Sequence, residues 1–160
     1  MNTLYTKMIE YYSGDPKRIQ HFTKVHSYAR LIGQLEHLSD DTQNILEIAA
    51  LVHDIGIKIS ELKYGNCNGK NQEKEGKAEA EKLLTELGYP QEVIERVSYL
   101  VGHHHSYDQI EGMDYQILIE ADYIVNASEN GYSKENVENF VEKIVKTQSG
   151  RELTRAVMSC

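Results

Sequence analysis

The sequence is poor in several residue types. Its 160 residues include no tryptophan, two phenylalanines, two prolines and two cysteines. Cys67 and Cys160 lie far apart and lack metal-site spacing, so we expect free thiols in a reducing compartment. No apolar run approaches the roughly 20 residues of a membrane span, and the segment Met1 to Tyr5 is unlike the start of a signal peptide. We therefore expect a cytoplasmic protein with no membrane partner.

Positive charge is also scarce. The chain has 17 basic and 25 acidic residues, and its formal net charge is −8. Such a balance argues against a surface that coats a nucleic-acid polymer, although it is compatible with a local basic pocket for a phosphate group. The length corresponds to one domain with a full hydrophobic core. Nothing in the composition indicates the oligomeric state.

Helical periodicity runs through the chain, and no strand pattern competes with it, which predicts an all-α fold. We expect one domain over residues 1–160, with a core over 15–128 and C-terminal helices over 133–158 that pack against it as a cap. The segment Lys58–Asn71 is the one long polar stretch, and we expect it to be irregular. Asp15 and Ser39 have the chemistry of helix N-caps.

The most informative stretch is 45–56. Residues 45–52 are apolar on nearly every side apart from Glu47, which predicts a buried helix. We expect this helix to finish with His53 and Asp54 and to be ended by a left-handed Gly56. A buried carboxylate without a partner costs several kcal/mol, so Asp54 needs compensation. A metal ion is the simplest partner, because neutral imidazole and carboxylate are both metal ligands.

Further polar residues lie on the apolar faces of other predicted helices. His21 shares a face with Val25, and Asp122 shares one with Leu118 in a helix that we expect over residues 114–126. A lone inward histidine is usually a hydrogen-bonded core residue, but several such residues on converging helices favour a metal site. The predicted fold is therefore a compact bundle of about six to eight helices around a buried metal site.

Three consecutive histidines follow the apolar face of the helix that ends near Val101. Successive helical residues point about 100° apart, so all three cannot bind one ion within a regular helix. His104 is the best-placed inward residue, His103 is second, and we expect His105 at the loop surface. Extending the inner face of the helix over 72–87 backwards brings Gln72 or Glu73 inward.

Three segments resemble the HD-domain metal-dependent phosphohydrolase superfamily. His21-Phe-Thr-Lys-Val25 resembles its first ligand helix, Ala49-Ala50-Leu51-Val52-His53-Asp54 resembles its signature, and Glu120-Ala121-Asp122 resembles its closing aspartate. The resemblance covers roughly residues 18–127. It implies that His21, His53, Asp54 and Asp122 hold one divalent ion, which can be Fe, Mn, Mg, Zn, Co or Ni.

Some members of the superfamily bind a second ion through additional histidines. His103 and His104 match one of those positions, and Glu73 stands near the other, where this chain has no histidine before Gly76. These three residues are candidates for a second ion or for the substrate phosphate. The superfamily often has a lysine three residues after the HD aspartate. Here Lys58 comes one place later and is the candidate phosphate contact.

The resemblance implies hydrolysis of a phosphoester of a small nucleotide or a related phosphate substrate. A divalent ion lowers the pKa of water and polarises a phosphoryl oxygen, and Asp54, His104 and Lys58 are the candidate catalytic residues. One alternative is a di-iron oxygenase on the same helices, which a redox titration of the iron distinguishes. Another is a non-catalytic, metal-stabilised binding or regulatory module.

Overall fold

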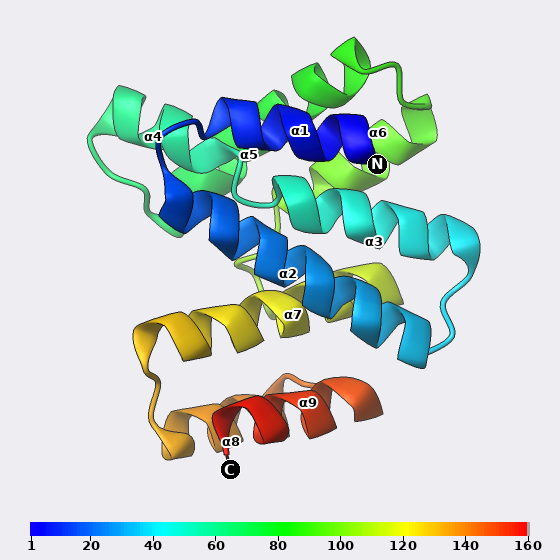
Figure 1. Ribbon diagram of the computed structural model, residues 1–160, viewed down its shortest axis with the longest axis vertical. Helices are drawn as coiled ribbons and strands as arrows, with labels where there is room; N and C mark the ends of the chain where they lie inside the picture. Colours follow the sequence, from blue (N-terminus) through cyan, green and yellow to red (C-terminus); the bar gives the residue numbers. More distant parts are fainter. Residues whose placement is uncertain (160) are drawn as a thin grey trace.

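The computed structural model describes residues 1–159, which form helices joined by short loops without any strand (Figure 1). The all-α prediction is confirmed. The helices are α1 (Asn2–Tyr11), α2 (Pro16–Leu35), α3 (Asp40–Val52), α4 (Gly56–Tyr64), α5 (Gly69–Glu86), α6 (Gln91–Val101), α7 (Met113–Asn130), α8 (Lys134–Lys143) and α9 (Gln148–Met158). None of the helices within residues 1–159 is long and apolar enough to cross a membrane.

Helix α3 occupies the centre of the bundle. It packs against α1, α2, α6 and α7, and α2 also packs directly against α7. Every residue from Ile48 to Val52 is fully buried, as the apolar run predicts. The three helices α2, α3 and α7 therefore meet around the end of α3, and this meeting point positions the polar residues of the site.

The expected N-caps are present. The Asp15 carboxylate accepts a hydrogen bond from the backbone N–H of Arg18 at 3.1 Å, and Pro16 is the first residue of α2. The Ser39 hydroxyl accepts one from the N–H of Thr42 at 3.3 Å at the start of α3. These short side chains satisfy backbone donors that have no partner within the helix, and they fix where each helix begins.

The end of α3 differs from the prediction. The helix stops at Val52, so His53 and Asp54 lie in the turn before α4, and Gly56 begins α4 without a left-handed conformation. Gly56 is required for close packing instead. A Cβ atom there would lie 2.3 Å from the carbonyl oxygen of Gln72 and 2.6 Å from the nitrogen of Gly76. Much of the segment predicted to be irregular is also helical, since α4 extends to Tyr64.

Helices α8 and α9 pack against each other, and α9 packs against α7 (Figure 1). The buried residues Tyr123, Ala127, Val137, Val141 and Val145 form a small separate hydrophobic cluster there. The carboxylate of the fully buried Glu120 accepts hydrogen bonds from the backbone N–H groups of Lys146 and Thr147, at 2.8 and 3.1 Å. It also accepts bonds from the Thr147 hydroxyl and from the Gln116 amide. Glu120 thus fastens the segment between α8 and α9 to α7.

Candidate metal centre

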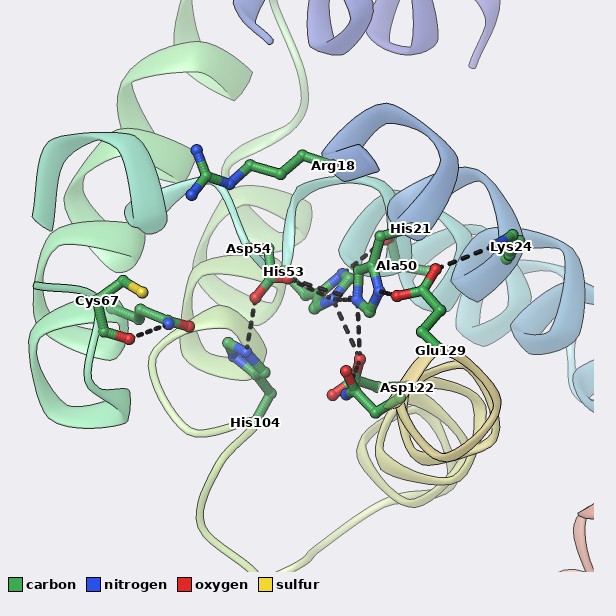
Figure 2. A network of polar contacts seen from close by, with 12 residues as sticks. Arg18, His21, Lys24, Ala50, His53, Asp54, Cys67, His104, Asp122 and Glu129 are labelled. Atoms are coloured by element: carbon green, nitrogen blue, oxygen red, sulfur yellow. Dashed lines mark hydrogen bonds and ion pairs between the residues drawn. The ribbon is translucent and has the colours of Figure 1, made fainter. Parts of the chain in front are cut away.

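The four predicted metal ligands come together at the junction of α2, α3 and α7. The Nε2 atoms of His21 and His53 lie 3.3 Å apart. An Asp54 oxygen lies 3.5 Å from the first and 3.4 Å from the second. An Asp122 oxygen lies 3.2 Å from His21 Nε2 and 3.5 Å from His53 Nε2. Figure 2 shows the two carboxylates approaching the imidazole pair from different sides.

The imidazole rings are held so that Nε2 faces this centre. His53 Nδ1 donates to the backbone carbonyl of Ala50 at 2.9 Å. His21 Nδ1 lies 2.9 Å from an oxygen of Glu129, whose other oxygen accepts from Lys24 Nζ at 3.0 Å. A proton held on Nδ1 leaves the Nε2 lone pair available, which is the arrangement that metal-binding histidines require.

The distances between these atoms suit a divalent ion. Ligands that each lie about 2.0 to 2.2 Å from one ion are roughly 3 to 3.5 Å from one another. The five distances between the imidazole nitrogens and their neighbours run from 3.2 to 3.5 Å. His21, His53 and Asp54 alone place their ligand atoms within 4.8 Å of one another, and Asp122 adds a fourth ligand from α7. The residues present therefore fit a divalent cation.

The charges of the site are mutually stabilising. Burial raises the pKa of Asp54, but the imidazoles of His53 and His104 outweigh burial and hold that pKa well below its usual value. Burial also raises the pKa of Asp122, but His21 and His53 outweigh it and lower that pKa. Burial lowers the pKa of His53, yet Asp54 and Asp122 raise it well above 6.5. Both aspartates are therefore ionised, and their negative charge favours a cation at this point.

A second group of ligand-type atoms adjoins the first. Asp54, His104 and His105 offer ligand atoms that all lie within 4.8 Å of one another. His104 is buried, and its Nδ1 donates to the Val101 carbonyl at 2.8 Å. Its Nε2 has no hydrogen-bond partner within residues 1–159, although it lies 3.5 Å from an Asp54 oxygen. A lone pair that faces a carboxylate in a buried position requires a proton or a cation between the two.

His105 is exposed in the turn that follows α6, as expected, and the same turn also brings it next to Asp54. Helix α6 ends at Val101, so the histidines lie in a turn and the 100° spacing of helical residues does not apply. The buried Tyr115 holds this turn, because its hydroxyl lies 2.6 Å from the carbonyl oxygens of both His103 and Ser106. As a result the rings of His104 and His105 lie 3.9 Å apart, next to Asp54.

Two other predicted residues have different roles. His103 stacks on Tyr99 at 4.2 Å and its Nδ1 donates to the Tyr99 carbonyl, so it does not join either group of ligand atoms. Glu73 also stays outside both groups, because its carboxylate accepts the backbone N–H of His105 at 3.1 Å and the Ser106 hydroxyl at 3.4 Å. Glu73 thus supports the histidine turn from α5.

Lys58 also lies elsewhere. Its Nζ donates to the Tyr11 carbonyl at 2.9 Å and lies over the Tyr11 ring, because the turn of α4 directs residue 58 towards α1. The cations near the metal centre are instead Lys17 and Arg18 from the first turn of α2, which line a pocket of about 260 Å³ with His21 and Asp54 at its base. Arg18 pairs with Asp15 and Glu61, whereas Lys17 has no ion-pair partner within residues 1–159.

Sequence reasoning missed Glu129 and Asn126, which also line the pocket. The Asn126 amide donates to an Asp122 oxygen at 2.9 Å. A signal for both was available, because positions four and seven residues after Asp122 lie on the same helix face. The predicted helix stopped at residue 126, whereas α7 continues to Asn130 and ends at Gly131 with φ 62°.

Comparisons with known proteins agree with this arrangement. The sequence profile of the HD domain family matches residues 18–149. The chain therefore belongs to the HD domain family. A crystal structure of a predicted HD superfamily hydrolase from an uncultured Thermotogales bacterium superposes with a TM-score of 0.72 at 20% identity, covering 99% of this chain and 85% of that one. At this identity the likeness shows the fold. Among curated protein sequences, none matches this chain.

Proposed function

We propose that this protein is a metal-dependent phosphohydrolase that cleaves a phosphoester of a small nucleotide or of a related small phosphate substrate, as the family resemblance implies. The observation that carries the proposal is the convergence of two imidazole Nε2 atoms and two carboxylates beside a pocket that His21, Asp54 and Lys17 line. Membership of the HD domain family and the fold shared with a predicted HD superfamily hydrolase support it.

His21, His53, Asp54 and Asp122 would hold the divalent cation. When bound, such an ion acts as a Lewis acid on a phosphoryl oxygen and makes water acidic enough to react near neutral pH. Glu129 and the Ala50 carbonyl keep the two imidazoles in the tautomer that binds a metal. The ionised Asp54 faces both the imidazole pair and His104, so it can orient a water molecule beside the phosphorus.

Hydrolysis forms one P–O bond from water, breaks the P–O bond to the alcohol, and delivers a proton to the departing oxygen. Lys17 is our candidate for the residue that receives the phosphate, because it lines the pocket and has no ion-pair partner among residues 1–159. Lys58 is bound to the Tyr11 carbonyl and has no place in this proposal. His104, with its buried and unpartnered Nε2, either supplies the proton or shares a second cation with Asp54 and His105.

The test is metal analysis of protein purified without chelator, followed by hydrolysis assays on a panel of phosphate esters. The Asp54→Asn variant should fold, bind metal about 10-fold more weakly and lose turnover even when excess metal restores occupancy. The Lys17→Met variant should raise KM, and Lys58→Met serves as the matched control. Full activity of metal-supplemented Asp54→Asn protein would overturn the proposal.

A further inference from the structure

The pocket above the metal centre is small, and no Phe, Tyr or Trp side chain lines it. Its volume is about 260 Å³, whereas pockets for drug-sized ligands run from roughly 300 to 1,000 Å³. Ile57 is the one aliphatic residue in a lining that is otherwise charged or amide-bearing. Proteins usually bind nucleobases by stacking them on aromatic rings or by enclosing them in apolar walls. The one aromatic ring of this lining is the imidazole of His21, which is a candidate metal ligand, and the lining has no apolar wall.

The side-chain amides of Asn126 and Asn130 keep a free acceptor oxygen and one free N–H each. Asn126 uses its amide N–H on Asp122, and Asn130 uses its amide N–H on the Asn126 backbone carbonyl at 2.8 Å. Both contacts require the nitrogen to face its acceptor, which fixes the orientation of each amide. The side-chain oxygens of Asn126 and Asn130 therefore remain free, since neither has a hydrogen bond within the described part of the chain.

The charged side chains of Glu129 and Arg18 already have partners within the protein. Both oxygens of Glu129 are occupied by His21 and Lys24, and Arg18 is neutralised by Asp15 and Glu61. Within residues 1–159, what remains for a ligand is the ammonium group of Lys17, which has no ion pair there, and the amide groups of Asn126 and Asn130. A cation complements a phosphate group, and amide oxygens complement hydroxyl groups, which donate hydrogen bonds.

Building on the proposed function, we infer that the substrate is a small hydroxylated phosphate monoester of the sugar-phosphate or polyol-phosphate class. The phosphate lies at the metal centre beside Lys17, and hydroxyl groups of the alcohol part donate to Asn126 and Asn130. The lining offers a nucleobase no Phe, Tyr or Trp ring and no apolar wall, so we expect the base to contribute nothing to recognition.

The experiment compares kcat/KM for ribose 5-phosphate, AMP, CMP and ethyl phosphate with the metal-loaded enzyme. Ribose 5-phosphate should be cleaved as efficiently as both nucleotides, within about 3-fold, because the base contributes nothing. Ethyl phosphate lacks the hydroxyl groups and should be poorer by about 10-fold or more. A preference of 10-fold or more for either nucleotide over ribose 5-phosphate overturns the inference, and so does equal cleavage of ethyl phosphate.

Two variants connect the preference to the pocket. Asn130→Ala should lower the ratio of kcat/KM for ribose 5-phosphate to that for ethyl phosphate by about 5-fold or more, since it removes one acceptor. Asn44→Ala, an equivalent change on the exposed part of α3, should leave this ratio unchanged. An unchanged ratio in Asn130→Ala counts against the inference. If none of the four esters is cleaved faster than by Asp54→Asn protein, the proposed function itself fails.

Discussion

Glu129 shows how much a single residue outside the ligand set can matter. Its carboxylate lies 2.9 Å from His21 Nδ1, the ring atom opposite the one that faces the metal centre. A carboxylate behind a metal-binding histidine orients the ring and increases its basicity. The pKa of Glu129 is lowered because His21 and Lys24 outweigh burial, so this partner stays charged.

We therefore expect Glu129→Gln to weaken metal binding by about 10-fold while the fold is retained. Competition with a chromophoric chelator measures the affinity. Lys24→Met is the matched control, since Lys24 contacts the same carboxylate from the exposed side and should change the affinity by less than about 3-fold. Equal affinity of the Glu129→Gln and wild-type proteins would show that the contact has no influence on the metal.

The protonation of His53 predicts how stability depends on pH. In the metal-free protein its pKa is raised well above 6.5, so the stability from its charge is fully present below 6.5 and is lost as pH rises through the raised pKa. The pKa of Asp54 is lowered, so its contribution is present above 3.8 and is lost only as pH falls through the lowered value. The combined contribution of these two groups to the stability of the metal-free protein should therefore be greatest between pH 3.8 and 6.5.

A divalent ion binds neutral imidazole, so the stability that the ion adds should increase with pH, whereas the contribution of protonated His53 decreases with pH. The increase in Tm on adding excess Mn²⁺ should grow from about pH 6 to about pH 9, because fewer protons compete for the Nε2 atoms. Thermal melts with and without the ion measure this increase. An increase in Tm that stays constant across this range would contradict the prediction.

At the scale of elements, the junction of α4 and α5 depends on close backbone approach. The Cβ of an alanine at position 56 would meet backbone atoms of Gln72 and Gly76 at 2.3 and 2.6 Å, which a side-chain movement cannot relieve. Gly56→Ala should lower the free energy of unfolding by about 1–3 kcal/mol or more, as measured by urea denaturation. Gly69→Ala is the control, because its nearest contact is an ordinary 3.4 Å, and a similar loss in both variants would contradict the prediction.

The sequence patterns predicted which helices form better than they predicted the residues at which these helices end. The apolar faces of α2, α3 and α7 identified His21, His53 and Asp122 because burial of a polar group among apolar neighbours is visible in the periodicity. The last turn of α7 was missed because residues 128–130 are exposed and have no apolar periodicity, and Glu129 was missed with it.

The geometry of the histidine turn and the lysine of our proposed phosphate contact were harder to predict. His105 reaches Asp54 because Tyr115 and Glu73 hold a non-helical turn, and such a tertiary contact leaves no periodic signal. Lys17 and Lys58 are both exposed lysines near helix starts, and only the packing of α2 and α4 shows which one lines the pocket.

At the scale of the molecule, Glu120 connects the C-terminal helices to the site-bearing helix α7. Glu120→Gln replaces a carboxylate that accepts four hydrogen bonds with an amide whose N–H₂ group opposes the donors around it. We expect a loss of about 2–4 kcal/mol in the free energy of unfolding and faster amide hydrogen exchange in α8 and α9. Glu81→Gln on the exposed face of α5 should change stability by less than about 0.5 kcal/mol. Unchanged exchange in α8 and α9 of Glu120→Gln would count against this role.

His21 and Asp122 are neighbours in space but are 101 positions apart in the sequence. In polymer terms, a cation held between them is a reversible cross-link that closes a very long loop, and the entropy of closing a loop grows with its length. The same ion also joins the turn at residues 53–54 to both ends of that loop. Removal of the ion should therefore remove this cross-link between the early and late parts of the chain. The change should affect global unfolding as well as the chemistry at the pocket.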